Sequence, residues 1–248
     1  MTSAPSNLIQ KAYLLTLCAF LLAGAVSLGI HCANAIRAPY ELDYAEGVLL
    51  WQTEHVVNLE SAFRSLNEYP YVSFMYPPLY HAVVYFSQGL TGEMLSTGRL
   101  VSALSALGIA LLVGLQAWWA IPRRTAWFVR AGSALAGALF CASLSTMAWS
   151  QLMRVDMLAL LFTFAGIALF LTAARRPIQQ YLAFLCFVLA LFTKQTQMAA
   201  PAACLLLAFY IRPVQALRLL GFSLLLGAVG LAVLIPPTHG RYSRTCWC

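Results

Sequence analysis

Residues 157–174 read Met-Leu-Ala-Leu-Leu-Phe-Thr-Phe-Ala-Gly-Ile-Ala-Leu-Phe-Leu-Thr-Ala-Ala, and Arg175 and Arg176 follow directly. The stretch contains no charged residue. A bilayer core about 30 Å thick is crossed by a helix of about 20 apolar residues. An uncharged run of this length that ends at two arginines is typical of a transmembrane helix, so the sequence predicts that this segment crosses a membrane.

The composition of the whole chain extends this interpretation. Of its 248 residues, 61% are hydrophobic, 12% are aromatic and 9% are charged, and the mean hydropathy is +0.77. A soluble domain carries roughly 25% charged residues, and a globule of this size leaves much of its surface exposed to water. The composition excludes a soluble domain and a disordered chain. It predicts an all-α, polytopic transmembrane helix bundle whose first partner is the lipid bilayer.

The excess of basic residues carries information about topology. The net charge is +7 and the isoelectric point is about 9.2. Lys and Arg concentrate in the cytoplasmic loops of membrane proteins, and the chain lacks the basic surface interleaved with aromatic residues that nucleic-acid binding needs. We therefore expect no nucleic acid partner.

Hydropathy predicts about seven spans in a single membrane domain, residues 1–248. The predicted spans are 12–31, 100–120, 131–150, 157–174, 181–193, 197–211 and 219–235. The predicted parts are a cytoplasmic N-terminus (1–11), a non-cytoplasmic loop with surface helices (37–99), a helix bundle (100–235) and an atypical tail (236–248). The chain is predicted to be an integral, multi-pass protein, with a bacterial plasma membrane as the expected location.

Residues 77–90 are the ambiguous segment, because 14 residues with two prolines and a histidine are short for a span. If the segment does not cross, eight basic residues lie inside and seven outside; if it crosses, the counts become six and nine. The non-crossing arrangement obeys the positive-inside rule better. It predicts an interfacial or re-entrant helix here.

The acidic residues are the scarcer set. Seven of the eight fall within residues 37–99, and Asp156 lies in the turn before a later span, so the preferred topology puts all of them on the non-cytoplasmic side. In the same loop, apolar residues recur at helical spacing and predict an amphipathic surface helix with Trp51 as its interfacial anchor. These apolar residues are Leu49, Val56, Leu59, Phe63 and Leu66.

Three carboxylates, Glu41, Asp43 and Glu46, lie within six residues just after the first span. If a helix begins here, Asp43 and Glu46 share a face at spacing i, i+3. Carboxylates held together beside lipid have raised pKa values unless they are paired or bound to metal, which suits a general base or a divalent-cation ligand. The alternative is a solvated helix start, where acidic residues favour the helix dipole.

An aromatic segment, 69–81, leads into the ambiguous helix, and it includes Tyr76, Tyr80 and His81. It can form a wall for a sugar or an aromatic belt at the membrane interface. His81 is a candidate metal ligand together with Glu46, and the alternative is a histidine that is simply hydrogen-bonded.

Arg154 and Asp156 lie between two strong spans, where charged residues are costly and often functional. The two side chains can pair with each other. Alternatively, Arg154 can hold a phosphate through its planar guanidinium, with Lys194 on the same side of the membrane adding positive charge.

Taken in order, these motifs resemble those of the C-type glycosyltransferases, in the branch of protein O-mannosyltransferases, the lipid A aminoarabinose transferase and Rgt-type lipopolysaccharide sugar transferases. The matching motifs are Asp43 to Gly47, Pro77-Pro-Leu79-Tyr-His81, Arg99-Leu100 and Arg154-Val-Asp156, and the resemblance covers residues 12–175. Two features differ from the family. Relatives often carry adjacent Asp-Glu where Tyr44 and Ala45 intervene here, and Tyr76 stands where many have Lys or His.

The resemblance implies an enzyme that moves a sugar from a polyprenyl-phosphate donor to an acceptor hydroxyl at the non-cytoplasmic face, with inversion. The acceptor is unidentified. The implied roles are catalytic base for Asp43 and then Glu46, donor phosphate binding for Arg154, Lys194 and Arg99, and substrate contact for Asp156, Tyr76 and Tyr80. A divalent metal ion bound by Glu46 and His81 is an alternative source of positive charge.

Two other hypotheses come from the sequence. The family typically has further spans and often a C-terminal soluble domain, so the atypical tail favours a truncated, inactive fragment as one alternative. A transporter or flippase-like protein is the other, although such proteins use ionisable groups at mid-membrane depth, and these spans carry almost none.

Overall fold

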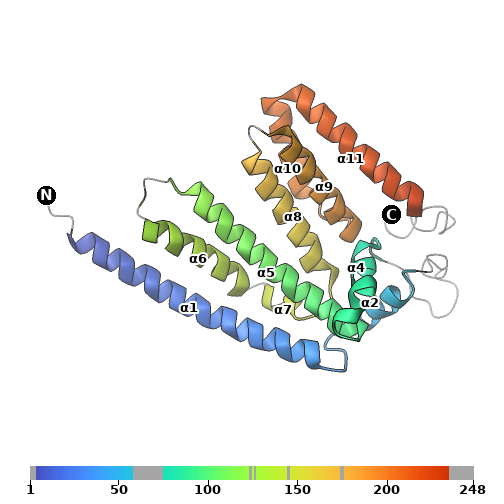
Figure 1. Ribbon diagram of the computed structural model, residues 1–248, viewed down its shortest axis with the longest axis horizontal. Coiled ribbons are helices and arrows are strands. Elements are labelled where there is room, and N and C mark those ends of the chain that lie inside the picture. The colour runs from blue at the N-terminus through green and yellow to red at the C-terminus, as the bar shows by residue number, and fades with distance from the viewer. Residues whose placement is uncertain are drawn as a thin grey trace.

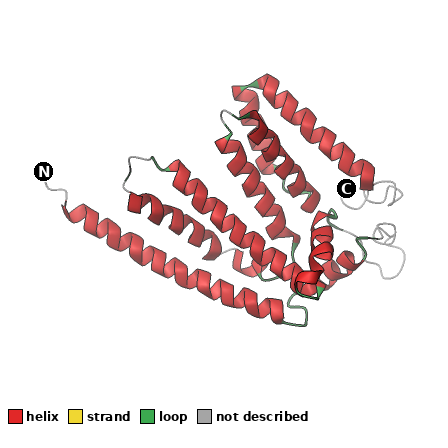
Figure 2. Ribbon diagram, viewed as in Figure 1, coloured by secondary structure: helices red, strands yellow, loops and turns green. Residues whose placement is uncertain are grey.

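The computed structural model describes residues 4–57, 75–122, 125, 127–143, 146–173 and 176–234. The molecule is 84% helix, and the described residues contain no strand (Figure 2). The α-helices are α1 (Ala4–Arg37), α2 (Tyr44–Glu54), α4 (Leu79–Ser87), α5 (Met94–Ala120), α6 (Trp127–Ser143), α7 (Thr146–Ser150), α8 (Val155–Thr172), α9 (Pro177–Thr193), α10 (Ala199–Ile211) and α11 (Pro213–Leu234), and a 3-10 turn covers Gln88–Leu90.

Four of these helices are long and apolar enough to cross a membrane. They are α5, α8, α11 and the Lys11–Arg37 part of α1. The helices α9 and α10 are apolar but shorter. The prediction of a helical membrane protein is therefore confirmed. The prediction of about seven spans is not, because a helix must be about 20 residues long to cross the core unaided.

The helices form two groups that meet along α5 and α8 (Figure 1). In the first group α1 and α5 pack on α6, and in the second α9 packs on α8 and α11. Small residues permit the close approach: a Cβ atom on Gly114 of α5 would lie 3.0 Å from the Ala134 carbonyl oxygen of α6. A Cβ on Gly166 of α8 would lie 2.5 Å from the ring of Phe187 on α9.

The short helices α2 and α4 lie across one end of the bundle, where α5 and α8 begin (Figure 1). With 9 residues, α4 is about 14 Å long at 1.5 Å per residue and cannot cross the bilayer by itself. This length agrees with the interpretation of residues 77–90 as a non-crossing segment. Of the predicted amphipathic helix, α2 contains Leu49, while Leu59, Phe63 and Leu66 lie outside the described residues.

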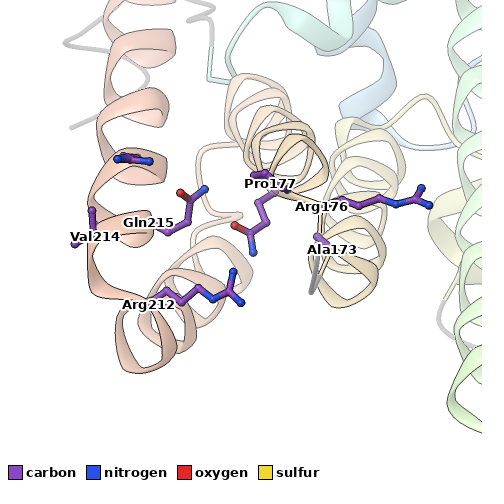
Figure 3. A pocket seen from close by; sticks show the side chains of 8 residues that line it. Ala173, Arg176, Pro177, Arg212, Val214 and Gln215 are labelled. Carbon is purple, nitrogen blue, oxygen red and sulfur yellow. The ribbon is translucent and has the colours of Figure 1, made fainter.

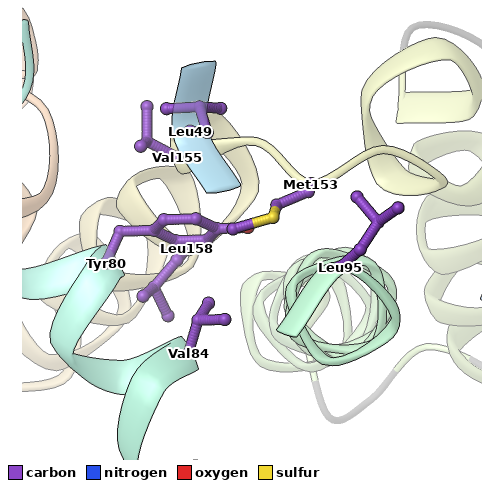
Figure 4. Close-up of a cluster of buried hydrophobic side chains, with 7 residues drawn as sticks. All are labelled: Leu49, Tyr80, Val84, Leu95, Met153, Val155 and Leu158. Atoms are coloured by element: carbon purple, nitrogen blue, oxygen red, sulfur yellow. The ribbon is translucent and has the colours of Figure 1, made fainter. Parts of the chain in front are cut away.

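A buried apolar cluster fixes these helix ends to one another (Figure 4). Its residues come from α2, α4, α5, the start of α8 and the segment just before α8: Leu49, Tyr80, Val84, Leu95, Met153, Val155 and Leu158. Met153 fits because Gly98 has no side chain, since a Cβ there would lie 2.4 Å from Met153 Cγ. The cluster holds the segments that carry the predicted site residues in one place.

Candidate functional site

Within the described part of the chain, three ion pairs lie at this end of the molecule, and they use six of the residues predicted from the sequence. The pairs are Glu46–Arg99, Asp43–Arg154 and Asp156–Lys194. Each joins residues far apart in the chain, so the fold is what brings the predicted motifs together.

The Glu46–Arg99 pair is completely buried, with both side chains 0% exposed. Arg99 Nε donates to Glu46 Oε1 at 2.9 Å and Nη2 donates to Oε2 at 2.7 Å, which is a two-point contact. The remaining guanidinium hydrogens go to the carbonyl oxygens of Ala35 (2.6 Å), Ala38 (2.8 Å) and Tyr40 (2.8 Å). All five donor positions of the guanidinium are therefore used within the protein.

The Glu46 carboxylate is equally committed. Besides Arg99, it accepts backbone N–H groups from Leu42 and Met153, each at 2.7 Å. Burial alone would raise the pKa of the Glu46 carboxyl, but hydrogen bonds from Arg99 and the two amides outweigh burial and hold the pKa below its ordinary value. A base or a phosphate ligand needs access to substrate. This geometry instead suits a clamp that fixes the α1–α2 connection to α5 and to the segment before α8.

The Asp43–Arg154 pair is partly exposed. Arg154 Nη2 donates a hydrogen bond to Asp43 Oδ2. The Arg154 side chain is 15% exposed and the Asp43 side chain is 22% exposed. Asp43 occupies the N-cap position of α2, yet its side chain makes no capping hydrogen bond and turns to Arg154 instead. The Arg154 guanidinium also lies over the Trp149 ring, 4.5 Å from its centroid, which helps to orient a planar cation.

The second accessible pair, Asp156–Lys194, joins the beginning of α8 to the end of α9. Lys194 Nζ, at the C-terminal end of α9, lies 2.5 Å from Asp156 Oδ1 in the first turn of α8, and the exposed fractions are 22% and 25%. Lys194 Nζ is also 5.9 Å from the centroid of the Tyr76 ring. Arg154 and Asp156 do not pair with each other, which is the alternative considered from the sequence. Arg154 pairs with Asp43, and Asp156 pairs with Lys194.

Tyr80 and His81 lie in the interior. Both side chains are 0% exposed, and the Tyr80 hydroxyl donates to the carbonyl oxygen of Gly98 at 3.2 Å. His81 Nδ1 lies 2.9 Å from Thr53 Oγ1, which itself donates to the Leu49 carbonyl oxygen at 2.8 Å. Burial lowers the pKa of His81 to about 3, so the ring is neutral at physiological pH. These two residues join α4 to α2 and α5.

The predicted metal site is not assembled. Among the described residues, no group of three or more His, Cys, Asp or Glu side chains could hold a metal ion. Of the two predicted ligands, Glu46 is held by Arg99 and two amides, and His81 is held by Thr53. The donor set therefore does not fit a divalent cation.

Several contacts at the site have no counterpart in the predictions. The Met153 amide on Glu46 and the Gln195 side chain, which donates to the Met75 carbonyl oxygen at 3.1 Å, are examples. Backbone donors leave no signal in a sequence. The contact between Trp149 and Arg154 does leave a signal in the sequence, because an aromatic residue five positions before an arginine at a helix end is well placed to contact that cation.

Comparison of the chain with models of protein families, with curated proteins and with solved structures gave no match. The two accessible ion pairs and the resemblance of the motifs are therefore the observations that bear on function.

Proposed function

We propose that the protein is a membrane glycosyltransferase that takes a sugar from a polyprenyl-phosphate donor and passes it to an acceptor hydroxyl. The observation that carries the proposal is the pairing of Asp43 with Arg154 and of Asp156 with Lys194 at one end of an apolar bundle, with all four side chains partly exposed. A carboxylate beside cations, at the end of a membrane domain, provides both groups that transfer from a lipid-linked phosphate needs.

Asp43 is the proposed base. The acceptor oxygen attacks the anomeric carbon and forms the new C–O bond, its proton moves to the Asp43 carboxylate, and the bond from the anomeric carbon to the phosphate oxygen breaks. The leaving group is polyprenyl phosphate. A single displacement through an oxocarbenium-like transition state inverts the anomeric centre.

Arg154 and Lys194 are the proposed phosphate ligands. In the structure each cation is neutralised by a carboxylate, Asp43 or Asp156. An arriving phosphate offers Arg154 a stronger two-point partner, and exchange of Arg154 from Asp43 to phosphate would release the carboxylate to act as base. Negative charge that builds on the departing phosphate is then stabilised by both cations.

Glu46 and Arg99 take a positioning role in this proposal instead of the roles expected from the resemblance. Glu46, itself held by Arg99, accepts hydrogen bonds from the Met153 amide, one residue before Arg154, and from the Leu42 amide, one residue before Asp43. The clamp thus fixes the backbone next to both members of the accessible pair. Tyr76, beside Lys194, is the aromatic residue retained as a substrate contact.

An apolar pocket near this end supports a lipid-linked donor. It has a volume of about 590 Å³ and lies between α9, α10 and α11, with Phe187, Leu205 and Leu224 in its lining. Met198, four residues after Lys194, lines the same pocket. A prenyl chain in this pocket would place its phosphate toward Lys194. We further propose that this end faces the non-cytoplasmic side of a bacterial plasma membrane, because the basic residues Arg176, Arg212 and Arg218 lie at other helix ends.

The test is sugar transfer in proteoliposomes, with a panel of radiolabelled polyprenyl-phosphate hexoses and pentoses and with cell-envelope extract as the acceptor source. We expect Asp43→Asn to lose at least 100-fold in rate. The matched control is Glu54→Gln, an exposed carboxylate on α2, which is expected to keep full activity. Full activity of Asp43→Asn, or movement of free sugar across the vesicle without transfer, would contradict the proposal.

A charge-swapped variant separates a structural pair from a catalytic one. Asp43→Arg combined with Arg154→Asp keeps an ion pair between the two segments, so we expect thermal stability close to that of the wild type. It moves the carboxylate away from the base position, so transfer is expected to stay abolished. Recovery of more than half the activity would show that only the pair, and not the carboxylate at residue 43, is needed.

A further inference from the structure

A second polar site lies where α9, α10 and α11 meet, at helix ends that take no part in the proposed transfer reaction (Figure 3). It is an open pocket of about 380 Å³. The polar residues in its lining are Arg176, Gln180, Arg212, Gln215 and Arg218. The arginines come from the N-cap of α9, the C-cap of α10 and the first turns of α11, so the fold gathers them from three helices.

No carboxylate neutralises these cations within the part of the chain that the structure describes. The pocket lining contains none, and the three ion pairs between described residues involve other residues. Neither α9 nor α11 has an acidic residue in its first turn. Positive charge is therefore concentrated here with no carboxylate partner among the described residues, which favours an anionic ligand.

The side chains differ in how they face the pocket. In Figure 3, Arg212 and Gln215 extend toward Ala173 and Pro177, whereas the Arg176 guanidinium points away from them. Arg176, Arg212 and Arg218 are all exposed, and exposed side chains change rotamer within nanoseconds. Arg212, with Gln215 beside it, is thus the centre of the site, and Arg176 belongs to its rim.

An adjoining groove identifies the kind of anion. A second pocket, of about 350 Å³, shares Gln180, Arg212 and Gln215 with the basic pocket. The rest of its lining is apolar: Phe170, Leu171, Leu207, Ala208 and Ile211. A cationic pocket that continues into an apolar groove on the outside of a membrane bundle is complementary to a molecule with an anionic head and a hydrocarbon chain.

We propose that this site binds an anionic phospholipid. Arg212 and Arg218 hold the headgroup phosphate, Arg176 turns inward to join them, and the first part of an acyl chain lies along Leu207 and Ile211. This inference goes beyond the proposed function, because the site uses none of the residues of the two accessible ion pairs and stands whether or not the protein transfers a sugar.

The experiment is native mass spectrometry of the delipidated full chain in detergent, titrated with dioleoyl phosphatidylglycerol or dioleoyl phosphatidylcholine. Each cation near a membrane surface contributes a factor of about five in affinity for anionic lipid. We therefore expect tight binding of one phosphatidylglycerol. The triple variant Arg176→Gln, Arg212→Gln, Arg218→Gln is expected to lose binding on the order of 100-fold.

The control variant Arg37→Gln, Arg241→Gln, Arg244→Gln removes the same charge from elsewhere in the sequence and is expected to bind like the wild type. Replacing the three pocket arginines by lysine keeps the charge and should keep affinity within about fivefold. If the triple glutamine variant does not fold, Arg212→Gln alone, expected to bind about fivefold more weakly, gives the same comparison.

Three results would overturn the proposal. The first is equal affinity for phosphatidylglycerol and phosphatidylcholine. The second is an equal loss in the control variant. The third is displacement of the lipid by millimolar inorganic phosphate, which would show that the pocket takes a free anion and that the apolar groove contributes nothing.

Discussion

Replacement of Arg99 by methionine tests whether the buried clamp holds this end of the protein together. Methionine keeps much of the length of the side chain but removes its charge and all its donors. Glu46 would then retain only the amides of Leu42 and Met153. The carbonyl oxygens of Ala35, Ala38 and Tyr40 would lose their guanidinium donors as well.

The expected cost follows from burial. Removal of one partner from a fully buried pair leaves an uncompensated charge and costs about 3–5 kcal/mol. A partly exposed pair contributes only about 0–1 kcal/mol, so Arg154→Met should be much milder. For a chain of this size, 1 kcal/mol corresponds to about 2–4 °C in Tm. Arg99→Met is therefore expected to lower Tm by roughly 6–20 °C.

The assay uses one of the protein's own thiols. In a background that retains Cys32 as its single cysteine, a thiol-reactive fluorophore reports the exposure of this residue, which is buried in α1, as the detergent-solubilised protein is heated. Arg37→Met, an exposed arginine at the end of the same helix, is the control and should change Tm by less than 2 °C. The double variant Glu46→Leu, Arg99→Met removes the stranded charge and should recover at least half of the loss.

The pH dependence gives a second measurement. Because the Glu46 pKa is lowered by folding, its contribution to stability is present above its ordinary pKa of 4.5 and is lost as pH falls through the lower folded value. The difference between wild type and Arg99→Met should therefore shrink below pH 4.5. A Tm for Arg99→Met within 2 °C of that of Arg37→Met would refute the reasoning.

Three further variants probe the same end of the molecule. Gly98→Ala places a Cβ against Met153 and should cost about 1–3 kcal/mol; a double-mutant cycle with Met153→Ala should recover at least 1 kcal/mol, and strict additivity would contradict the contact. Folding lowers the pKa of His81 from 6.5 to about 3, so the Tm of the wild type should be highest above pH 6.5 and should fall between pH 6.5 and 5. The variant His81→Asn keeps a hydrogen-bond donor at this position but does not titrate, so its Tm should stay constant over the same range. Lys194→Met should lower kcat in the transfer assay by about 100-fold with a smaller change in KM, while Lys194→Arg should keep most of the activity; equal losses in both would argue against a phosphate contact.

The parts of the fold that depend on local sequence were predictable. Hydropathy is a property of consecutive residues, so the long apolar helices and the short length of α4 could be predicted from their segments alone. The pairing of the charges could not. Asp43 and Arg154 are 111 residues apart, and nothing in either segment specifies the other.

Asp43 and Glu46 can share a helix face only if both residues are helical. Asp43 is instead the N-cap of α2, with φ −144° and ψ 137°. That extended backbone turns its carboxylate toward Arg154, while Glu46, inside the helix, turns toward Arg99. A single residue at a helix boundary thus sends the two carboxylates to different partners, and helix boundaries are the least certain part of any sequence-based assignment.

The position of Tyr80, predicted as a substrate contact, also depends on which face of a helix a residue occupies. Tyr80 and Val84 are separated by four positions on α4 and are both fully buried, so one face of this helix belongs to the core. The i, i+4 spacing could have indicated this, whereas the aromatic composition of residues 69–81 left open both a sugar-binding wall and an aromatic belt at the membrane interface. Tyr76 precedes the helix, remains half-buried and lies beside Lys194, which leaves it in reach of a ligand.

Burial divides the charges of the site into two groups with different consequences. Glu46 and Arg99 have no exposed atoms and no unused donors between them, so exchange of partners would cost several kcal/mol. Asp43, Arg154, Asp156 and Lys194 are 15–25% exposed, and partners held in such pairs by about 1 kcal/mol can be replaced by a ligand. A site that must bind a phosphate and then release a base needs partly exposed charges, and the buried Glu46–Arg99 pair holds these charges in place. The clamp meets the accessible pairs through the amides of Leu42 and Met153, so loss of the clamp should move Asp43 and Arg154 apart before it unfolds the membrane helices.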